Sequence, residues 1–167
     1  MGSTLLRNKS QTLWTMRSES GTMSEKWDQR FIELAHHISG WSKDPSTKVG
    51  CIVVGKDREI RSTGFNGFPR GIADDSERLE DREQKYPLIC HAEENAIMHA
   101  ARIGLSLKGC TAYVTWPPCT RCARSLIQAG VVEVVYPTKI EVPERWQKDF
   151  DMSTSMMKEA GLKIRQA

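Results

Sequence analysis

The sequence predicts an α/β fold in which a mixed β-sheet carries helices on both of its faces. Residues 49–55 form a short apolar run, and residues 59–64 return as a second strand after a Lys-Asp turn, which is the pattern of an antiparallel hairpin. From residue 91 onward, segments of helical periodicity alternate with short apolar strands. Such alternation is typical of a sheet with helices packed against it.

The first half of the chain adds one helix and two loops to the hairpin. Residues 24–39 have apolar side chains at helical spacing and are followed by Gly40, so a helix is predicted there. Residues 64–71 contain three glycines and one proline, which predicts an irregular loop. Residues 74–86 are densely charged, and we expect an exposed loop or helix without a chemical role.

The second half supplies the alternating elements. We predict helices over 91–102, 119–129 and 143–159 and strands over 109–115, 131–136 and 162–165. Gly104 and Gly130 follow the first two helices, as expected for helix ends. The strand over 131–136 is apolar apart from Glu133, which is typical of a strand covered on both faces.

The composition is that of one soluble domain. The chain has 167 residues, of which 39% are hydrophobic and 27% are charged. Charged residues interrupt every apolar stretch, so no membrane-spanning helix is expected. The net charge is +3, and residues 1–22 carry +2 of it. The nearly neutral remainder argues against binding of long nucleic acid, which usually requires a basic patch.

The chain divides at about residue 22. Residues 1–22 are rich in Ser and Thr and have no clear apolar period, so we expect a flexible arm or an added extension. A single domain is then predicted over residues 23–167. The five cysteines are odd in number, and no apolar signal-peptide core is visible. We therefore expect free or metal-bound thiols and a cytoplasmic location.

Two short segments carry the candidate chemistry. His91 stands two residues before Glu93, and Cys119 and Cys122 form a Cys-x-x-Cys pair after a proline. One imidazole and two thiolates leave a fourth zinc position for water, which is the arrangement of a catalytic site. Glu93 is then free to move the protons of that water. This pattern is the signature of zinc nucleobase deaminases, so we expect one zinc ion per chain.

Helix geometry places these side chains. Cys119 and Cys122 share one helix face, and a helix N-terminus lowers thiol pKa values. Glu93 lies about 200° around a regular helix from His91, so we place His91 at the very start, before the backbone becomes helical. Arg102 lies on the His91 face, about 16 Å further along. We predict that Arg102 reaches back to bind a 5′-phosphate.

Two other interpretations of the cysteines stay open at this point. The Cys119–Cys122 pair has the spacing of a thioredoxin-like redox motif. A purely structural zinc would need a fourth ligand, for which Cys90 and Cys110 are the candidates. Both are more typical of small buried residues.

The sequence resembles the deoxycytidylate (dCMP) deaminases of the cytidine deaminase superfamily. The matching segments are residues 42–45, 48–50, 64–69, 90–93, 95–97, 101–102, 109–115, 118–119, 122–123 and 127–130. The resemblance implies a three-layer αβα cytidine-deaminase-like fold with a mixed five-stranded sheet. It also implies zinc-dependent hydrolysis of dCMP to dUMP and ammonia, which supplies thymidylate synthesis.

The resemblance implies further roles. Asn66 would contact the sugar and Arg102 the phosphate. If Arg102 does not bind the phosphate, Ser42 and Lys43 are the next candidates. The family is often hexameric, and many members respond to dCTP and dTTP at a separate site, with Mg²⁺ on the triphosphate. That site would lie near the glycine-rich loop, for which we select Gly67 and Arg70. We therefore expect a homo-oligomer with a small nucleotide as substrate.

Two positions depart from the family pattern. The family places a tyrosine after the last paired strand to stack on the base, and no aromatic residue stands there. Trp116, Tyr136 and Trp146 are the candidates to replace it. Glu94 occupies the place of the usual leucine, and we expect little consequence. The alternative functions are deamination of another base, such as guanine or a tRNA adenosine, and regulatory nucleotide binding with little catalysis.

Overall fold

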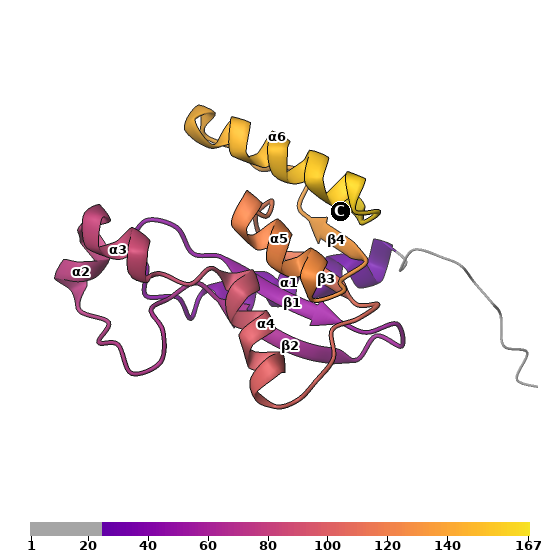
Figure 1. Cartoon of the computed structure of the whole chain (residues 1–167), viewed down its shortest axis with the longest axis horizontal. Helices are drawn as coiled ribbons and strands as arrows, with labels where there is room; N and C mark the ends of the chain where they lie inside the picture. The colour runs from indigo at the N-terminus through magenta and orange to yellow at the C-terminus, as the bar shows by residue number, and fades with distance from the viewer. Residues whose placement is uncertain (1–24) are drawn as a thin grey trace, which may run out of the picture.

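The computed structural model describes residues 25–167, and the predicted arm over residues 1–22 lies outside them. Its centre is a five-stranded sheet with strand order β2-β1-β3-β4-β5 (Figure 1). The strands are β1 (Gly50–Val54), β2 (Ile60–Phe65), β3 (Thr111–Val114), β4 (Glu133–Tyr136) and β5 (Lys163–Gln166). Strand β1 pairs antiparallel with β2 and β3, whereas β3, β4 and β5 are parallel. The prediction of a mixed sheet is confirmed.

The helices begin and end close to the predicted residues. They are α1 (Glu25–Ser39), α2 (Ser76–Glu80), α3 (Arg82–Leu88), α4 (Ala92–Arg102), α5 (Thr120–Gln128) and α6 (Glu144–Glu159). The charged segment over 74–86 contains most of two short helices. None of the helices between residues 25 and 167 is long and apolar enough to cross a membrane.

Alternate residues of the central strand point into two separate cores. Ile52 and Val54 pack with the apolar face of α1 on one side of the sheet. Cys51 and Val53 pack on the other side, with residues of α4, α5 and α6. Successive strand residues point to opposite faces, and both faces of β1 are covered. This explains why all five residues of β1 are buried, and it confirms the three-layer αβα architecture.

Helix α4 lies very close to strand β2, and Gly64 makes this approach possible. A Cβ atom at Gly64 would lie 2.2 Å from the Ala92 carbonyl oxygen and 2.5 Å from the Ala96 nitrogen. Both distances are too short for any side chain. The glycine therefore lets the first turn of α4, which carries Glu93, lie directly on the sheet.

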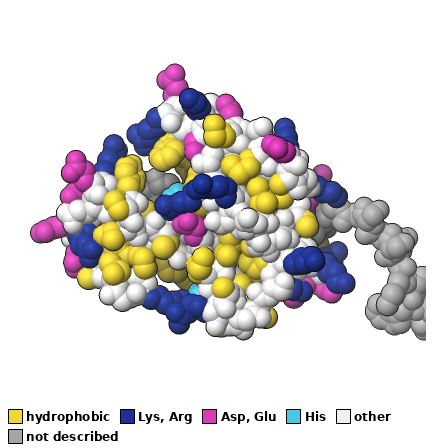
Figure 2. Space-filling view, in the orientation of Figure 1, with side chains coloured by type: hydrophobic (Ala, Val, Ile, Leu, Met, Phe, Trp, Pro, Cys, Tyr) yellow, Lys and Arg dark blue, Asp and Glu magenta, His cyan; other side chains and the backbone are white. Residues whose placement is uncertain are grey.

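A buried ionic network joins the first helix to the last strand. Asp28 is 1% exposed and accepts hydrogen bonds from Arg165 at 2.6 and 3.0 Å and from the Tyr113 hydroxyl at 2.8 Å. Arg165 also donates to Glu133 at 2.7 Å. Burial and the hydrogen bond to Asp28 raise the pKa of Tyr113. On the face shown in Figure 2, Lys and Arg side chains are dispersed among other types, in keeping with the small net charge.

Candidate active site

The three predicted metal ligands meet at the starts of two helices. His91 precedes α4 with φ −76° and ψ 163°, and Cys119 precedes α5 with φ −72° and ψ 171°. Both residues are extended, as we predicted for His91 from helix geometry. The His91 Nδ1 atom lies 3.4 Å from the sulfur of Cys119 and 3.4 Å from that of Cys122.

These distances fit a zinc ion. All three ligand atoms lie within 4.8 Å of one another. Zinc bonds of about 2.1 Å to nitrogen and about 2.3 Å to sulfur place tetrahedral ligands roughly 3.6 Å apart. Within residues 25–167, neither Cys90 nor Cys110 joins this group, and all five cysteines are free thiols. The structure thus offers no fourth protein ligand there, and no disulfide between Cys119 and Cys122.

The pKa values of the two cysteine thiols are strongly shifted by their surroundings. Hydrogen bonds from Cys122 and His91 lower the pKa of the Cys119 thiol to about 4. The pKa of Cys122 is raised, first by its hydrogen bond to Cys119 and then by burial. The hydrogen bond between the two side chains thus shifts their pKa values in opposite directions. A divalent cation between them would favour both thiolates, because a coordinating thiol is deprotonated.

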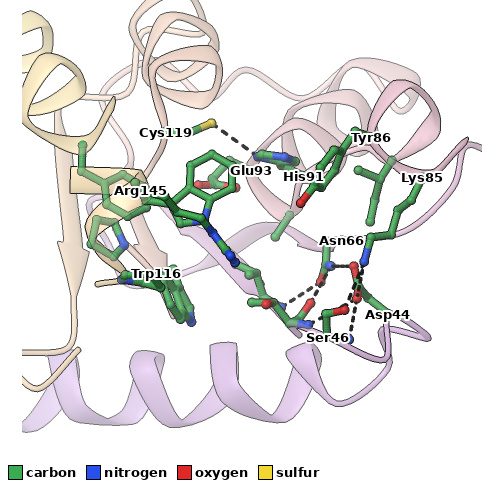
Figure 3. Close-up of a pocket in the computed structure, with 18 of the residues that line it drawn as sticks. Asp44, Ser46, Asn66, Lys85, Tyr86, His91, Glu93, Trp116, Cys119 and Arg145 are labelled. Atoms are coloured by element: carbon green, nitrogen blue, oxygen red, sulfur yellow. Dashed lines mark hydrogen bonds and ion pairs between the residues drawn. The ribbon is translucent and has the colours of Figure 1, made fainter. Parts of the chain in front are cut away.

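Glu93 is buried beside the ligands. Its side chain comes from the first turn of α4 and lines a cavity together with His91 and Cys119 (Figure 3). The residue is 3% exposed, and burial raises the pKa of its carboxyl to about 7, against the lowering effect of His91. A group that titrates near neutral pH can both accept and release a proton, as a general acid–base requires.

Glu94 and Arg121 connect the two ligand segments directly. One Glu94 oxygen accepts a hydrogen bond from the His91 backbone N–H at 3.0 Å and another from Arg121 at 2.9 Å. Arg121 stands between the two cysteine ligands and also donates to the Ile89 carbonyl at 3.1 Å. The expectation that Glu94 has little consequence is therefore wrong. Its carboxylate holds the N-terminus of α4 against the first turn of α5.

Helix α6 is held over the cysteine segment by two polar contacts. Asp149 accepts hydrogen bonds from the Thr120 backbone N–H at 3.0 Å and from its hydroxyl at 2.7 Å. Ser153 donates to the Pro118 carbonyl at 2.6 Å. These contacts position the first two turns of α6 along one wall of the cavity.

The cavity has a volume of about 220 Å³ and is open to solvent. Trp116, which follows β3, and Trp146 and Phe150 of α6 provide its aromatic walls. Of the three aromatic residues considered as replacements for the missing tyrosine, Trp116 and Trp146 line the cavity and Tyr136 does not. Two flat indoles that line the same cavity as Glu93 offer a stacking surface for a planar base.

A polar wall faces these aromatic residues (Figure 3). Asp44 accepts a hydrogen bond from Lys85 at 3.2 Å, and both side chains are 6% exposed. The Asn66 amide donates to the Thr47 carbonyl at 2.9 Å and to Asp44 at 3.4 Å, while its oxygen accepts from the Val49 N–H at 2.8 Å. Asn66 lines the cavity and has a second lone pair on its oxygen that could accept from a sugar hydroxyl, so its predicted contact with the sugar stays a prediction.

Three predicted phosphate contacts lie away from this cavity. Arg102 is exposed at the last residue of α4, and a helix of that length carries it roughly 16 Å from His91. Lys43 is exposed and pairs with Asp74 at 2.9 Å. Ser42 is buried and donates to the Asn66 carbonyl at 2.8 Å. The reach of Arg102 was overestimated, and Ser42 and Lys43 serve the fold of their loop.

The predicted regulatory residues also lie outside the cavity. Gly67 pairs with Cys90 through backbone hydrogen bonds at 2.9 and 3.1 Å. The Arg70 guanidinium contacts the Nε2 atom of His99 on α4. His99 and Arg102 are three residues apart and are therefore neighbours on one helix face.

Sequence reasoning missed the contribution of residues 82–86. Arg82, Lys85 and Tyr86 of α3 all line the cavity, as does Arg145 of α6. The expectation of an exposed segment over residues 74–86, which came from its density of charge, is therefore wrong for Lys85, which is buried. Lys85 is only 5% exposed in the folded protein, and the many charged residues around it in the sequence gave no indication of this burial.

The fold and the three-ligand site define a zinc-dependent deaminase. The chain belongs to the cytidine and deoxycytidylate deaminase family, whose zinc-binding region matches residues 25–138. A deaminase of Aliivibrio fischeri is 41% identical over 143 residues, which are 85% of this chain and 94% of that protein. Mouse deoxycytidylate deaminase is 40% identical over 116 residues, which are 66% of this chain and 64% of that enzyme. The chain thus matches slightly less than two thirds of the mouse enzyme.

A solved structure extends the likeness over nearly all of the described residues. The dCMP deaminase of the cyanophage S-TIM5, in complex with dCMP and dUMP, superposes with a TM-score of 0.74. The identity is 28%, and the match covers 87% of this chain and all of the phage chain. Zinc is therefore the metal that the site is expected to hold, and a redox role for the cysteine pair is not supported.

Proposed function

We propose that this protein hydrolyses dCMP to dUMP and ammonia, supplying dUMP for thymidylate synthesis. The observation that carries the proposal is the position of Glu93, buried beside the three-ligand group in an open cavity with two indole walls. A binding protein has no use for a buried proton shuttle, so this position disfavours the purely regulatory alternative. The deoxycytidylate deaminases among its relatives support dCMP over guanine or a tRNA adenosine.

The chemistry divides between the metal and one carboxyl group. Zinc held by His91, Cys119 and Cys122 would supply Lewis-acid activation of water. Glu93 takes one proton from that water and delivers it to the ring nitrogen of the base as the water oxygen adds to the amino-bearing carbon. Glu93 then carries the second proton to the amino group, which leaves as ammonia. Water and dCMP are consumed, and no other reactant is needed.

Ammonia release from a substrate panel tests this proposal. The panel contains dCMP, CMP, deoxycytidine, guanine and a tRNA with an adenosine at the wobble position. We expect turnover with dCMP to exceed that with every other compound. A stronger reaction with guanine or tRNA would show that dCMP is not the preferred substrate. If the zinc-loaded protein released no ammonia from any compound, the regulatory nucleotide-binding function would be favoured instead.

The resemblance to dCMP deaminases also leads us to propose a cytoplasmic homo-oligomer, of which a hexamer is one form, regulated by dCTP and dTTP with Mg²⁺. Arg70 contacts His99, and Arg102 is a neighbour of His99 on the same face of α4. These two guanidinium groups support the proposal because they lie away from the cavity, where an anionic effector would not compete with substrate. We expect dCTP with Mg²⁺ to raise the initial velocity at low dCMP and dTTP to lower it. Velocities unchanged by either nucleotide, across their full solubility range, would exclude this regulation.

A further inference from the structure

Three cationic side chains line the cavity, and one of them is already neutralised. They are Arg82, Lys85 and Arg145. Lys85 is buried against Asp44, which holds its ammonium group at 3.2 Å. A buried ammonium paired with a carboxylate has little charge left for a ligand. Lys85 therefore shapes the polar wall and is not the group that recognises an anion.

The two arginines have no partner of this kind. Within residues 25–167, the side chain of neither Arg82 nor Arg145 takes part in a hydrogen bond or an ion pair, and both residues are exposed. The acidic residues among the cavity-lining side chains are Asp44 and Glu93. Asp44 is engaged by Lys85, and Glu93 lies beside the metal ligands. No carboxylate in the cavity wall is thus available to neutralise the guanidinium groups.

The arginines approach the cavity from different elements. Arg82 is the first residue of α3, and Arg145 is the second residue of α6. Figure 3 shows α3, marked by Lys85 and Tyr86, on one side of the zinc-ligand segment and Arg145 on the other. Arg145 precedes Trp146, one of the two indoles available to stack on a base. Both residues line the cavity, so a base that stacks on Trp146 lies in the same cavity as the guanidinium of Arg145.

The geometry points to Arg82 and Arg145 as the residues that bind the 5′-phosphate of the substrate, one from each side of the cavity entrance. This inference rests on the proposed deamination of a nucleoside 5′-monophosphate. The reacting carbon must lie at Glu93, which is buried, and the phosphate is at the opposite end of such a nucleotide. Guanidinium groups match phosphate oxygens in pairs, and two of them balance the charge of a dianion.

Single variants of the two arginines test the assignment. Arg82→Gln and Arg145→Gln remove the charge and keep a polar side chain of similar reach. Each should lower kcat/KM for dCMP by about ten- to a hundred-fold, as expected for loss of one charge-assisted contact. Activity on deoxycytidine, which has no phosphate, should stay within about twofold. Arg145→Lys should recover part of the loss, because it restores the charge without the paired geometry.

Two further arginines serve as controls. Arg124→Gln changes an exposed arginine of α5 that does not line the cavity, and it should leave both substrates unaffected. Arg102→Gln tests the residue that helix periodicity alone selects. If Arg102→Gln lowers the preference for dCMP over deoxycytidine while the Arg82 and Arg145 variants do not, the assignment is overturned. Equal losses on dCMP and deoxycytidine in the Arg82 and Arg145 variants would likewise overturn it, since such losses indicate a structural role.

A binding measurement separates this inference from the proposed reaction. Titration calorimetry of zinc-loaded Glu93→Gln protein with dCMP, dUMP and deoxycytidine needs no turnover. Arg82→Gln and Arg145→Gln in that background should each weaken dCMP and dUMP by about ten-fold or more and leave deoxycytidine unchanged. The weakening should also shrink at high salt, because exposed charges are screened. If the protein deaminates dCMP but the two substitutions leave nucleotide affinity unchanged, the inference fails and the proposed function stands. If dCMP is not a substrate, the calorimetric result still decides whether the arginines bind a phosphate.

Discussion

Glu93→Gln should lower turnover on dCMP by at least about 1,000-fold and leave one zinc ion per chain in place. The glutamine amide keeps the size and the hydrogen-bonding reach of the carboxyl group but cannot accept and release a proton. The proposed reaction uses Glu93 for more than one proton transfer, and each typically contributes 10²- to 10⁴-fold. Turnover and zinc content are measured on the same purified sample, by ammonia release and elemental analysis.

Two neighbouring substitutions serve as controls for this result. Cys122→Ser should lose the zinc ion together with activity, because a thiolate ligand is replaced by a hydroxyl. Glu94→Gln changes the adjacent carboxyl group, which bonds His91 and Arg121 and does not line the cavity. It should retain far more activity than Glu93→Gln. A Glu93→Gln enzyme with near-normal turnover would remove Glu93 from the proton transfers.

The elements of the fold could be predicted because each carries its own local pattern. In β1, the short continuous apolar run reflects a strand covered by α1 on one face and by α4 and α5 on the other. The extended conformation of His91 followed from a local conflict as well. A regular helix would point His91 and Glu93 in different directions, and placing His91 before the helix start removes the conflict.

The cavity walls could not be predicted in the same way, because they depend on contacts between distant segments. Lys85 belongs to a charged run whose composition predicts exposure, and only the arrival of Asp44, 41 residues earlier, makes its burial favourable. Arg145 lies in α6, and the apolar periodicity of that helix does not indicate which of its ends packs against the zinc-ligand segments. For Arg102, the local pattern was informative but the position of the cavity was not known. Periodicity gave its helix face correctly but could not show that the cavity lies at the other end.

The substitution Glu94 for the usual leucine shows how a departure from a family pattern acquires meaning. Without its contacts, Glu94 would be only a polar residue at a partly buried position. In the structure its carboxylate accepts hydrogen bonds from both ligand segments, through His91 and Arg121. The sequence alone could not predict this role, because Glu94 and its partner Arg121 are 27 residues apart and neither residue indicates the other.

Lys85→Met should lower the free energy of unfolding by about 3–5 kcal/mol, because it leaves the buried Asp44 carboxylate without its cation. Lys43→Met is a matched control, since Lys43 also pairs with an aspartate, Asp74, and at a shorter distance of 2.9 Å against 3.2 Å. The Lys43 side chain is 68% exposed, so its loss should cost at most about 1 kcal/mol. Urea unfolding of the three proteins at neutral pH measures the difference.

The Lys85–Asp44 pair is longer than the Lys43–Asp74 pair but is expected to contribute more stability. A larger loss for Lys85→Met would therefore show that burial, and not a short distance, determines the contribution of the ion pair. Adding Asp44→Asn to Lys85→Met should restore part of the lost stability, because the uncompensated charge is removed. An amide oxygen at that position can still accept the N–H groups of Ser46 and Thr47, which Asp44 holds at 2.8 and 3.2 Å. If Lys43→Met and Lys85→Met cost the same, the Asp44–Lys85 pair is solvated in the folded protein. The polar wall of the cavity would then be a loop that water enters, and its residues would contribute less to holding the sugar.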